Sequence, residues 1–210
     1  MESIVLSTGN PDKVREMTDL IDETRFEVLC KSDFGLEGLE IEETGQTLAE
    51  NAKLKVEGLA DAMRKKGIDP DKYWIISDDT GLFVDALGGR PGVYSSRYAG
   101  PQCSYDDNVD KLLREMDGVE SEKRTAHFST VIALLKSGVL KEYEGRLDGE
   151  ILTERRGNEG FGYDPLFYMP AIGKSLAQLP EKEKNAISHR AGAYRKLMED
   201  INAGKDSNLC

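Results

Sequence analysis

The chain has 210 residues, of which 39% are hydrophobic and 32% are charged, and its formal net charge is −11. This length can bury a large core without disulfides, and the composition excludes an intrinsically disordered chain. The acidic charge argues against nonspecific binding to DNA or RNA, which usually requires a basic face.

No apolar run approaches the roughly 20 residues that a membrane-spanning helix needs, and we see no signal peptide. The three cysteines, Cys30, Cys103 and Cys210, match neither a zinc spacing nor a disulfide framework. We therefore expect reduced thiols in a cytoplasmic protein with no membrane partner, folded as a single domain over residues 1–210.

Hydrophobic patterning predicts strands that alternate with helices. We expect strands over 4–7, 26–30, 73–77, 125–136 and 139–146, and helices over 12–21, 47–66, 105–116 and 184–201. Thr47 and Glu50 form a capping box that begins the second helix, and Ser137-Gly138 forms a short hairpin turn. The order of elements favours an α/β fold with a mixed sheet.

Two adjacent carboxylates, Asp78 and Asp79, follow the apolar strand at 73–77. Ligand sites of α/β proteins cluster at the carboxyl ends of strands. Neighbouring residues on an extended chain point to opposite faces, so we expect one carboxylate to face the site and the other to cap or brace it. Mg²⁺ would relieve their repulsion, and Glu42-Glu43 is a second acidic pair. The alternative is a plain turn, because Asp-Asp-Thr-Gly is typical turn chemistry.

The segment from Ser7 to Lys13 joins a strand to a helix. Backbone N–H groups at a helix start can hold a phosphate, and Lys13 lies one turn into the helix. The segment lacks the GxxxxGK[ST] pattern of a Walker A loop, so an ordinary helix cap is the alternative.

Two further segments suggest a place for a nucleobase. The stretch Gly-Phe-Gly-Tyr-Asp-Pro at 160–165 puts two aromatic rings beside a carboxylate, and a base could stack on either ring. A packed aromatic corner is the alternative. Lys184, His189 and Arg190 form a local basic cluster in an acidic chain, for which a solvated helix face is the alternative.

Five segments, in order and spread over nearly the whole chain, together resemble the inosine triphosphate pyrophosphatase family. They are TGNPDKVREM at 8–17, EETGQTLAENAKLK at 42–55, SDDTGLFVDALGGRPGVYSSRYAG at 77–100, GFGYDPLF at 160–167 and EKNAISHRAGA at 183–193. The resemblance implies an elongated, mixed central sheet with flanking helices, two lobes around a deep nucleotide cleft, and a homodimer. It also implies Mg²⁺-dependent hydrolysis of ITP, dITP or XTP to the monophosphate and pyrophosphate, which keeps deaminated purines out of DNA and RNA.

The resemblance also implies roles for individual residues. The phosphates would contact Thr8, Gly9, Asn10, Pro11, Asp12 and Lys13. Lys55 matches a phosphate-contacting, catalytic lysine, and Thr80 matches a substrate contact. Glu43 and Asp79 match the metal-linked acidic positions, with Asp79 the general base. The base-recognition side would consist of Phe161, Gly162, Tyr163, Asp164, Lys184, His189 and Arg190.

The chain departs from the family pattern at two of these positions. Asp12 stands where many relatives have glycine, which brings a carboxylate near the phosphate segment, and Thr80 keeps the hydroxyl of the more usual serine. Glu42 stays an alternative to Glu43 as metal ligand. Two other functions are consistent with such a scaffold: a pyrophosphatase acting on pyrimidine or methylated nucleotides, and a non-catalytic nucleotide sensor.

Overall fold

The computed structural model describes residues 2–206, with side chains to residue 203. The chain divides into two compact units, and each unit is assembled from separate segments. Unit 1 comprises 1–79, 130–145 and 190–210, and unit 2 comprises 80–129 and 146–189. The expected cleft between two lobes stays a prediction.

A mixed β-sheet is the centre of the fold, as predicted. Its strands are β1 (Glu2–Leu6), β2 (Phe26–Cys30), β3 (Trp74–Val84), β4 (Pro91–Gly92), β5 (Thr125–Lys136), β6 (Val139–Ile151), β7 (Phe167–Met169) and β8 (Lys174–Ser175). The hydrogen-bonded order is β2-β1-β3-β5-β6-β7-β8, and β4 pairs with β3. β1 runs parallel to β2 and β3, whereas β4, β7 and β8 pair antiparallel. The two residues between β5 and β6, Ser137 and Gly138, both have positive φ, which confirms the predicted tight turn.

The first three helices begin at capping side chains, those of Asn10, Thr47 and Ser104. The helices are α1 (Pro11–Leu20), α2 (Leu48–Lys65), α3 (Tyr105–Glu115), α4 (Glu181–Ile187) and α5 (His189–Asp206). The capping box of Thr47 and Glu50 begins α2, as predicted. The single helix expected over 184–201 is wrong, because Ser188 adopts an extended backbone (φ −64°, ψ 158°) that separates α4 from α5.

β3 is longer than the sequence predicts. The expected strand end at Ser77 is wrong, because β3 continues through Asp78 and Asp79 to Val84. The two carboxylates therefore lie inside a strand, and the alternative of a plain turn is also wrong. The strand tolerates them because each has a cationic partner, described below, and because Leu82 resumes the buried apolar pattern.

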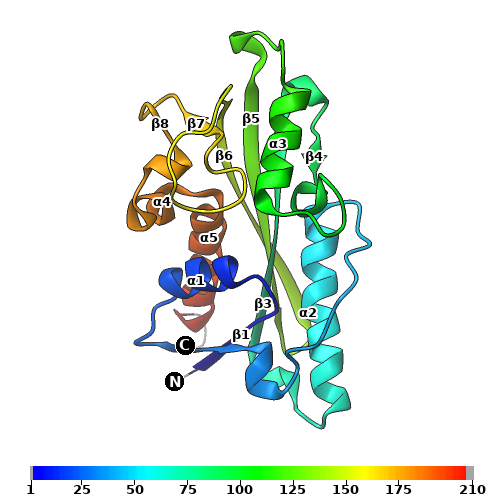
Figure 1. Ribbon diagram of the computed structural model, residues 1–210. Helices are drawn as coiled ribbons and strands as arrows, with labels where there is room; N and C mark the ends of the chain where they lie inside the picture. The colour runs from blue at the N-terminus through cyan, green and yellow to red at the C-terminus, as the bar shows by residue number, and fades with distance from the viewer. Residues whose placement is uncertain (1, 207–210) are drawn as a thin grey trace. The chain divides into compact units, whose positions relative to one another are not determined.

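Unit 1 has its own hydrophobic core between helices and strands. Figure 1 shows α1 and α5 on one side of β1 and β3, and α2 on the other side. The first side is filled by Ile4, Leu6, Met17, Ile21, Phe26, Ile76, Ile132, Leu134, Ala193, Tyr194, Leu197 and Ile201. Ala52, Val56, Leu59 and Met63 bury the inner face of α2. Both layers thus hold α1, α2 and α5 against the strands of unit 1.

Unit 2 has a second core around α3. Its buried members include Leu82, Val84, Val109, Leu112, Met116, Phe128, Tyr163, Leu166 and Phe167.

Among the described residues, no helix is both long and apolar enough to cross a membrane. Cys30 and Cys103 are free thiols, as expected, and Cys210 lies outside the described residues.

Candidate functional site

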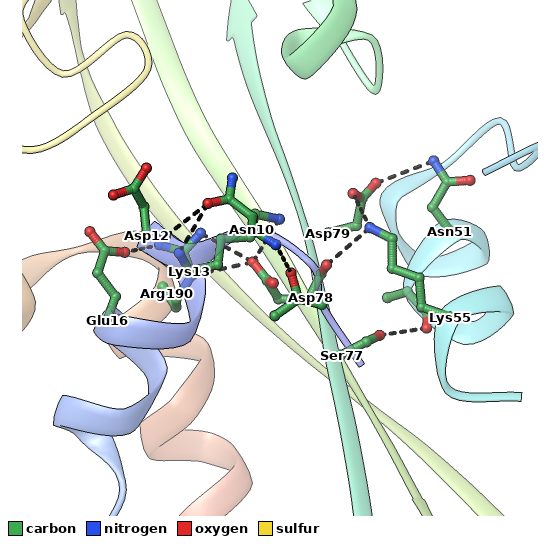
Figure 2. A network of polar contacts seen from close by, with 12 residues as sticks. Asn10, Asp12, Lys13, Glu16, Asn51, Lys55, Ser77, Asp78, Asp79 and Arg190 are labelled. Atoms are coloured by element: carbon green, nitrogen blue, oxygen red, sulfur yellow. Dashed lines mark hydrogen bonds and ion pairs between the residues drawn. The ribbon is translucent and has the colours of Figure 1, made fainter. Parts of the chain in front are cut away.

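The two carboxylates of β3 diverge, each toward its own set of partners. Figure 2 shows Asp78 directed toward Lys13 and Arg190, and Asp79 directed toward Asn51 and Lys55 of α2. The alternation of a strand produces this separation, because adjacent side chains point to opposite faces. The repulsion between neighbouring like charges is thereby replaced by two local ion-pair networks.

Asp78 is fully buried and lies in a row of side chains with alternating charges. Its Oδ2 atom accepts from Nε and Nη2 of Arg190 at 3.2 and 3.1 Å and lies 3.1 Å from Nζ of Lys13. The other end of the guanidinium donates to Glu16 of α1. Burial alone would raise the pKa of Asp78, but the charges of Lys13 and Arg190 outweigh it and hold the pKa well below its usual range. Asp78 is thus the bracing member of the pair.

Asp79 faces a second network built on α2. Its Oδ1 atom lies 2.9 Å from Nζ of Lys55, and its Oδ2 atom accepts from Nδ2 of Asn51 at 3.2 Å. The same ammonium lies 3.1 Å from Oε1 of Glu43. Burial raises the pKa of the Asp79 carboxyl above its ordinary value, although the charge of Lys55 opposes this shift. A raised pKa makes this carboxylate a better proton acceptor near neutral pH.

Asn51 joins the segment that carries Glu43 to the strand that carries Asp79. Its side chain is fully buried, and its Oδ1 atom accepts from the backbone N of Gly45 at 2.8 Å. A Cβ at position 45 would lie only 2.7 Å from that same oxygen, so the close approach requires glycine. The hydroxyl of Ser77 donates to Ala52 O at 2.6 Å, which fixes this turn of α2 against β3.

The carboxylates of Glu43 and Asp79 fit a divalent cation. Both lie within 3.1 Å of one ammonium, so they converge on a single point of positive charge. Among residues 2–206 no group of three or more His, Cys, Asp or Glu side chains is arranged to hold a metal ion. Two carboxylates are nevertheless enough for Mg²⁺ when phosphates supply the other oxygens. Glu42 is exposed and Glu43 makes the ion pair, which favours Glu43 of the two candidates.

The segment from Thr8 to Lys13 forms a helix cap. Asn10 Oδ1 accepts from the backbone N of Asp12 at 2.9 Å and of Lys13 at 3.4 Å. This is the cap that we considered as the alternative to phosphate binding, and Gly9 and Pro11 complete the turn into α1. The carboxylate of Asp12 pairs with Arg15 at 3.2 Å. Burial lowers the pKa of Lys13, although the charge of Asp78 opposes this. Phosphate contacts here stay a prediction.

In unit 2 the predicted base-recognition residues form a cluster of their own. Asp164 Oδ2 lies 2.5 Å from Nζ of Lys184 and accepts from the backbone N of Phe161 at 2.9 Å. The Lys184 ammonium also lies 4.7 Å from the centre of the Phe161 ring. A Cβ at Gly160 would lie 2.2 Å from the Asp164 carboxylate, so the loop can close only around a glycine. Gly162 has positive φ, which the same loop requires.

The other predicted residues lie in different surroundings. The Tyr163 hydroxyl donates to Ser95 O at 2.9 Å in the core of unit 2, as in the packed aromatic corner that we considered. The His189 ring stacks on Phe128 at 4.6 Å. Thr80 begins unit 2 on β3. Arg190 belongs to unit 1 and bonds the carboxylates described above, so its role in base recognition stays a prediction.

Three buried residues of these networks were not among the predicted site residues: Glu16, Asn51 and Asp78. Helical spacing could have identified two of them. Glu16 follows Lys13 by three residues on α1, and Asn51 precedes Lys55 by four on α2, so each shares a helix face with a predicted residue. The sequence does not reveal that Asp78 contacts Arg190, since 112 residues separate them.

Comparison with known proteins shows which family this chain is similar to. The model of the Ham1 family matches residues 4–200. A dITP/XTP pyrophosphatase of Caldanaerobacter subterraneus subsp. tengcongensis is 46% identical over 201 residues, which cover 96% of each chain. A dITP/XTP pyrophosphatase of Bacillus subtilis is 43% identical over 204 residues, covering 97% of this chain and 98% of the relative.

Solved structures show the same fold. The Ham1 protein of Staphylococcus aureus superimposes with a TM-score of 0.83 at 35% identity, covering 97% of this chain and all (100%) of that one. A Ham1 protein of Coxiella burnetii superimposes with a TM-score of 0.83 at 36% identity and the same coverage.

Proposed function

This chain belongs to the Ham1 family, and from this we propose that it hydrolyses non-canonical purine nucleoside triphosphates to the monophosphate and pyrophosphate. The substrates would be dITP, ITP and XTP, the nucleotides of deaminated purines. The relatives that carry the name dITP/XTP pyrophosphatase match this chain over almost its full length, and this match carries the proposal.

The charges of unit 1 support a triphosphate ligand. A nucleoside triphosphate carries about four negative charges, and an acidic protein must reverse its field locally to bind one. Lys13 pairs with Asp78 and Lys55 pairs with Asp79, so two ammonium groups lie beside β3. In our proposal these lysines bind the phosphate chain and stabilise the pyrophosphate that leaves.

Asp79 is the proposed general base. It would orient a water molecule and take its proton as the water oxygen attacks the α-phosphorus, and the bond from that phosphorus to the bridging oxygen would break. Lys55 and Asn51 hold both oxygens of the carboxylate, which fixes its orientation for this transfer. Such proton transfer contributes about 10²–10⁴-fold to a rate, while positioning and charge stabilisation contribute most of the rest.

Glu43 and Asp79 are the residues that would hold Mg²⁺. When bound there, the ion would supply positive charge to the triphosphate oxygens. We therefore expect Glu43→Gln to raise the Mg²⁺ concentration for half-maximal turnover by about tenfold or more, because a neutral amide is a weaker ligand. The measurement is a Mg²⁺ titration of turnover.

Glu42→Gln is the matched control for that titration. Glu42 is the exposed neighbour of Glu43, so its substitution should leave the Mg²⁺ requirement unchanged. A shift caused by Glu42→Gln and not by Glu43→Gln would reverse the assignment of the ligand.

The cluster of Phe161, Asp164 and Lys184 supports recognition of an oxopurine. Hypoxanthine and xanthine carry a 6-oxo acceptor where adenine carries a 6-amino donor. The buried Lys184 ammonium offers a donor beside an aromatic ring on which the base could stack. A site that bonds one polar group can reject an analogue lacking it by about 10⁴-fold, which is sufficient to exclude adenine nucleotides.

Product identification tests the proposed reaction. The purified protein is incubated with Mg²⁺ and, separately, dITP, XTP, dGTP, dATP, dCTP and dUTP, and the products are separated by ion-exchange chromatography. We expect dIMP and pyrophosphate from dITP, xanthosine monophosphate and pyrophosphate from XTP, and much slower turnover of the other four.

Other outcomes of this assay would identify another function. Release of dIDP and orthophosphate would refute cleavage at the α-phosphorus. Fastest turnover of dCTP or dUTP would favour a pyrimidine pyrophosphatase, and binding without any product would favour a nucleotide sensor. A homodimer in the cytoplasm completes the proposal, and sedimentation velocity measures the oligomeric state.

A further inference from the structure

The ammonium of Lys55 lies between the carboxylates of Glu43 and Asp79, the two residues that would hold a metal ion. It is 3.1 Å from Glu43 Oε1 and 2.9 Å from Asp79 Oδ1, and it also donates to the backbone O of Asp78 at 3.2 Å. The side chain is only 11% exposed. The carboxylates that fit a cation therefore already surround one, and that cation belongs to the protein.

Asn51 ties the segment that carries Glu43 to the carboxylate of Asp79. Asn51 donates to Asp79 Oδ2 and accepts from the backbone N of Gly45, two residues beyond Glu43. Both carboxylates lie within 3.1 Å of the Lys55 ammonium, so the pair already has a cationic partner. An incoming metal ion must compete directly with this charge.

We propose that Lys55 is an internal counter-ion that takes the place of the metal when no nucleotide is bound. Metal alone then binds weakly, because its entry would leave two positive charges at one pair of carboxylates. A triphosphate offers Lys55 a new anionic partner, so the metal and the nucleotide enter together. The inference rests on the proposed function, and it assigns to Lys55 control over metal binding in addition to phosphate contact.

Metal binding in the absence of nucleotide tests this proposal. The free Mn²⁺ signal is followed by electron paramagnetic resonance during titration of the wild type, Lys55→Met and the control Lys53→Met. Lys53 lies on the same helix but is half exposed (48%) and pairs with Glu57. We expect Lys55→Met to bind Mn²⁺ at least about tenfold more tightly than the wild type, because the competing charge is gone. Lys53→Met should bind like the wild type.

Two further measurements locate the effect. Glu43→Gln in the Lys55→Met background should lose the gained affinity, since one of the two carboxylates is removed. Lys55→Met alone leaves the buried carboxylate of Asp79 and the partly exposed carboxylate of Glu43 without their shared cation. Its Tm should therefore be lower than that of the wild type and should rise on addition of Mn²⁺. Lys55→Gln replaces Lys55→Met if the methionine variant does not fold.

Equal or weaker Mn²⁺ affinity of the Lys55 variants would overturn the proposal. So would a gain in affinity that persists after Glu43→Gln, because the metal would then lie elsewhere. These results are independent of turnover by the wild type. If the affinity rises as expected while the wild type produces no pyrophosphate from dITP or XTP, the competition by Lys55 stands and the proposed function fails.

Discussion

Asp79→Asn is expected to lower kcat for dITP by about 10²–10⁴-fold, because an amide cannot accept the proton from the attacking water. The fold should survive, since asparagine has nearly the same shape and its carbonyl can still accept from Lys55 at the 2.9 Å position of Oδ1. Steady-state kinetics with pyrophosphate detection measure the loss, and circular dichroism measures the fold.

The matched control is Asp71→Asn. Asp71 is an exposed aspartate that precedes β3 in unit 1, so the same chemical change there should leave kcat unaltered. If Asp79→Asn turned over dITP at near the wild-type rate, Asp79 would be neither the general base nor an essential ligand.

Arg190→Met is expected to lower the free energy of unfolding by about 3–5 kcal/mol, because it leaves the carboxylates of Glu16 and Asp78 buried without their shared cation. Both side chains are at most 3% exposed, so water cannot replace the lost charge. Urea unfolding at neutral pH measures the difference. If this variant does not fold, Glu16→Gln removes one ion pair and should destabilise the protein by a smaller amount.

The loss of unfolding free energy in Arg190→Met should be smaller at acidic pH than at neutral pH. In the wild type, burial opposes ionisation of Asp78, but Lys13 and Arg190 hold its pKa below the value in the unfolded chain. The stabilisation from this group is therefore complete above the unfolded pKa and is lost as the pH falls through the folded one. In Arg190→Met, Asp78 keeps Lys13 but loses its second cation, so its carboxylate takes up a proton more readily than in the wild type. The deficit should therefore shrink on acidification.

Arg195→Met is the matched control for this experiment. Arg195 lies on the same helix, α5, but is exposed, and its loss should change the free energy of unfolding by about 0.5 kcal/mol or less. Equal unfolding of the two variants would contradict a structural role for Arg190. The dITP to dATP preference of Arg190→Met tests the other assignment, and an unchanged ratio would remove Arg190 from base recognition.

The local parts of this fold could be predicted from the sequence. Side-chain periodicity located the strands and helices, and the capping box of Thr47 and Glu50 located the start of α2 to the residue. Such signals act within one or two turns, so a short segment contains all the information needed. The Ser137-Gly138 turn is another example, because positive φ at both residues is a local preference.

The chemistry of the site was also partly visible in the sequence. Asp79, Lys55, Glu43 and Lys13 were predicted from their motifs, and the structure brings Asp79 and Glu43 each within hydrogen-bonding distance of Lys55. The alternation of side chains along an extended chain predicted that Asp78 and Asp79 would point to opposite faces, and the structure confirms this. Which of them faces a substrate stays a prediction.

Only the tertiary structure decided which charges are paired. The strand was expected to stop before Asp78, but β3 continues because cations from other parts of the chain neutralise both carboxylates. Arg190 reaches Glu16 across 174 residues, and no local preference of either segment encodes that contact. A buried ion pair depends on which remote side chains are brought together by packing. The sequence alone therefore determined the elements and the motif residues, and the folded chain determined the partners of those residues.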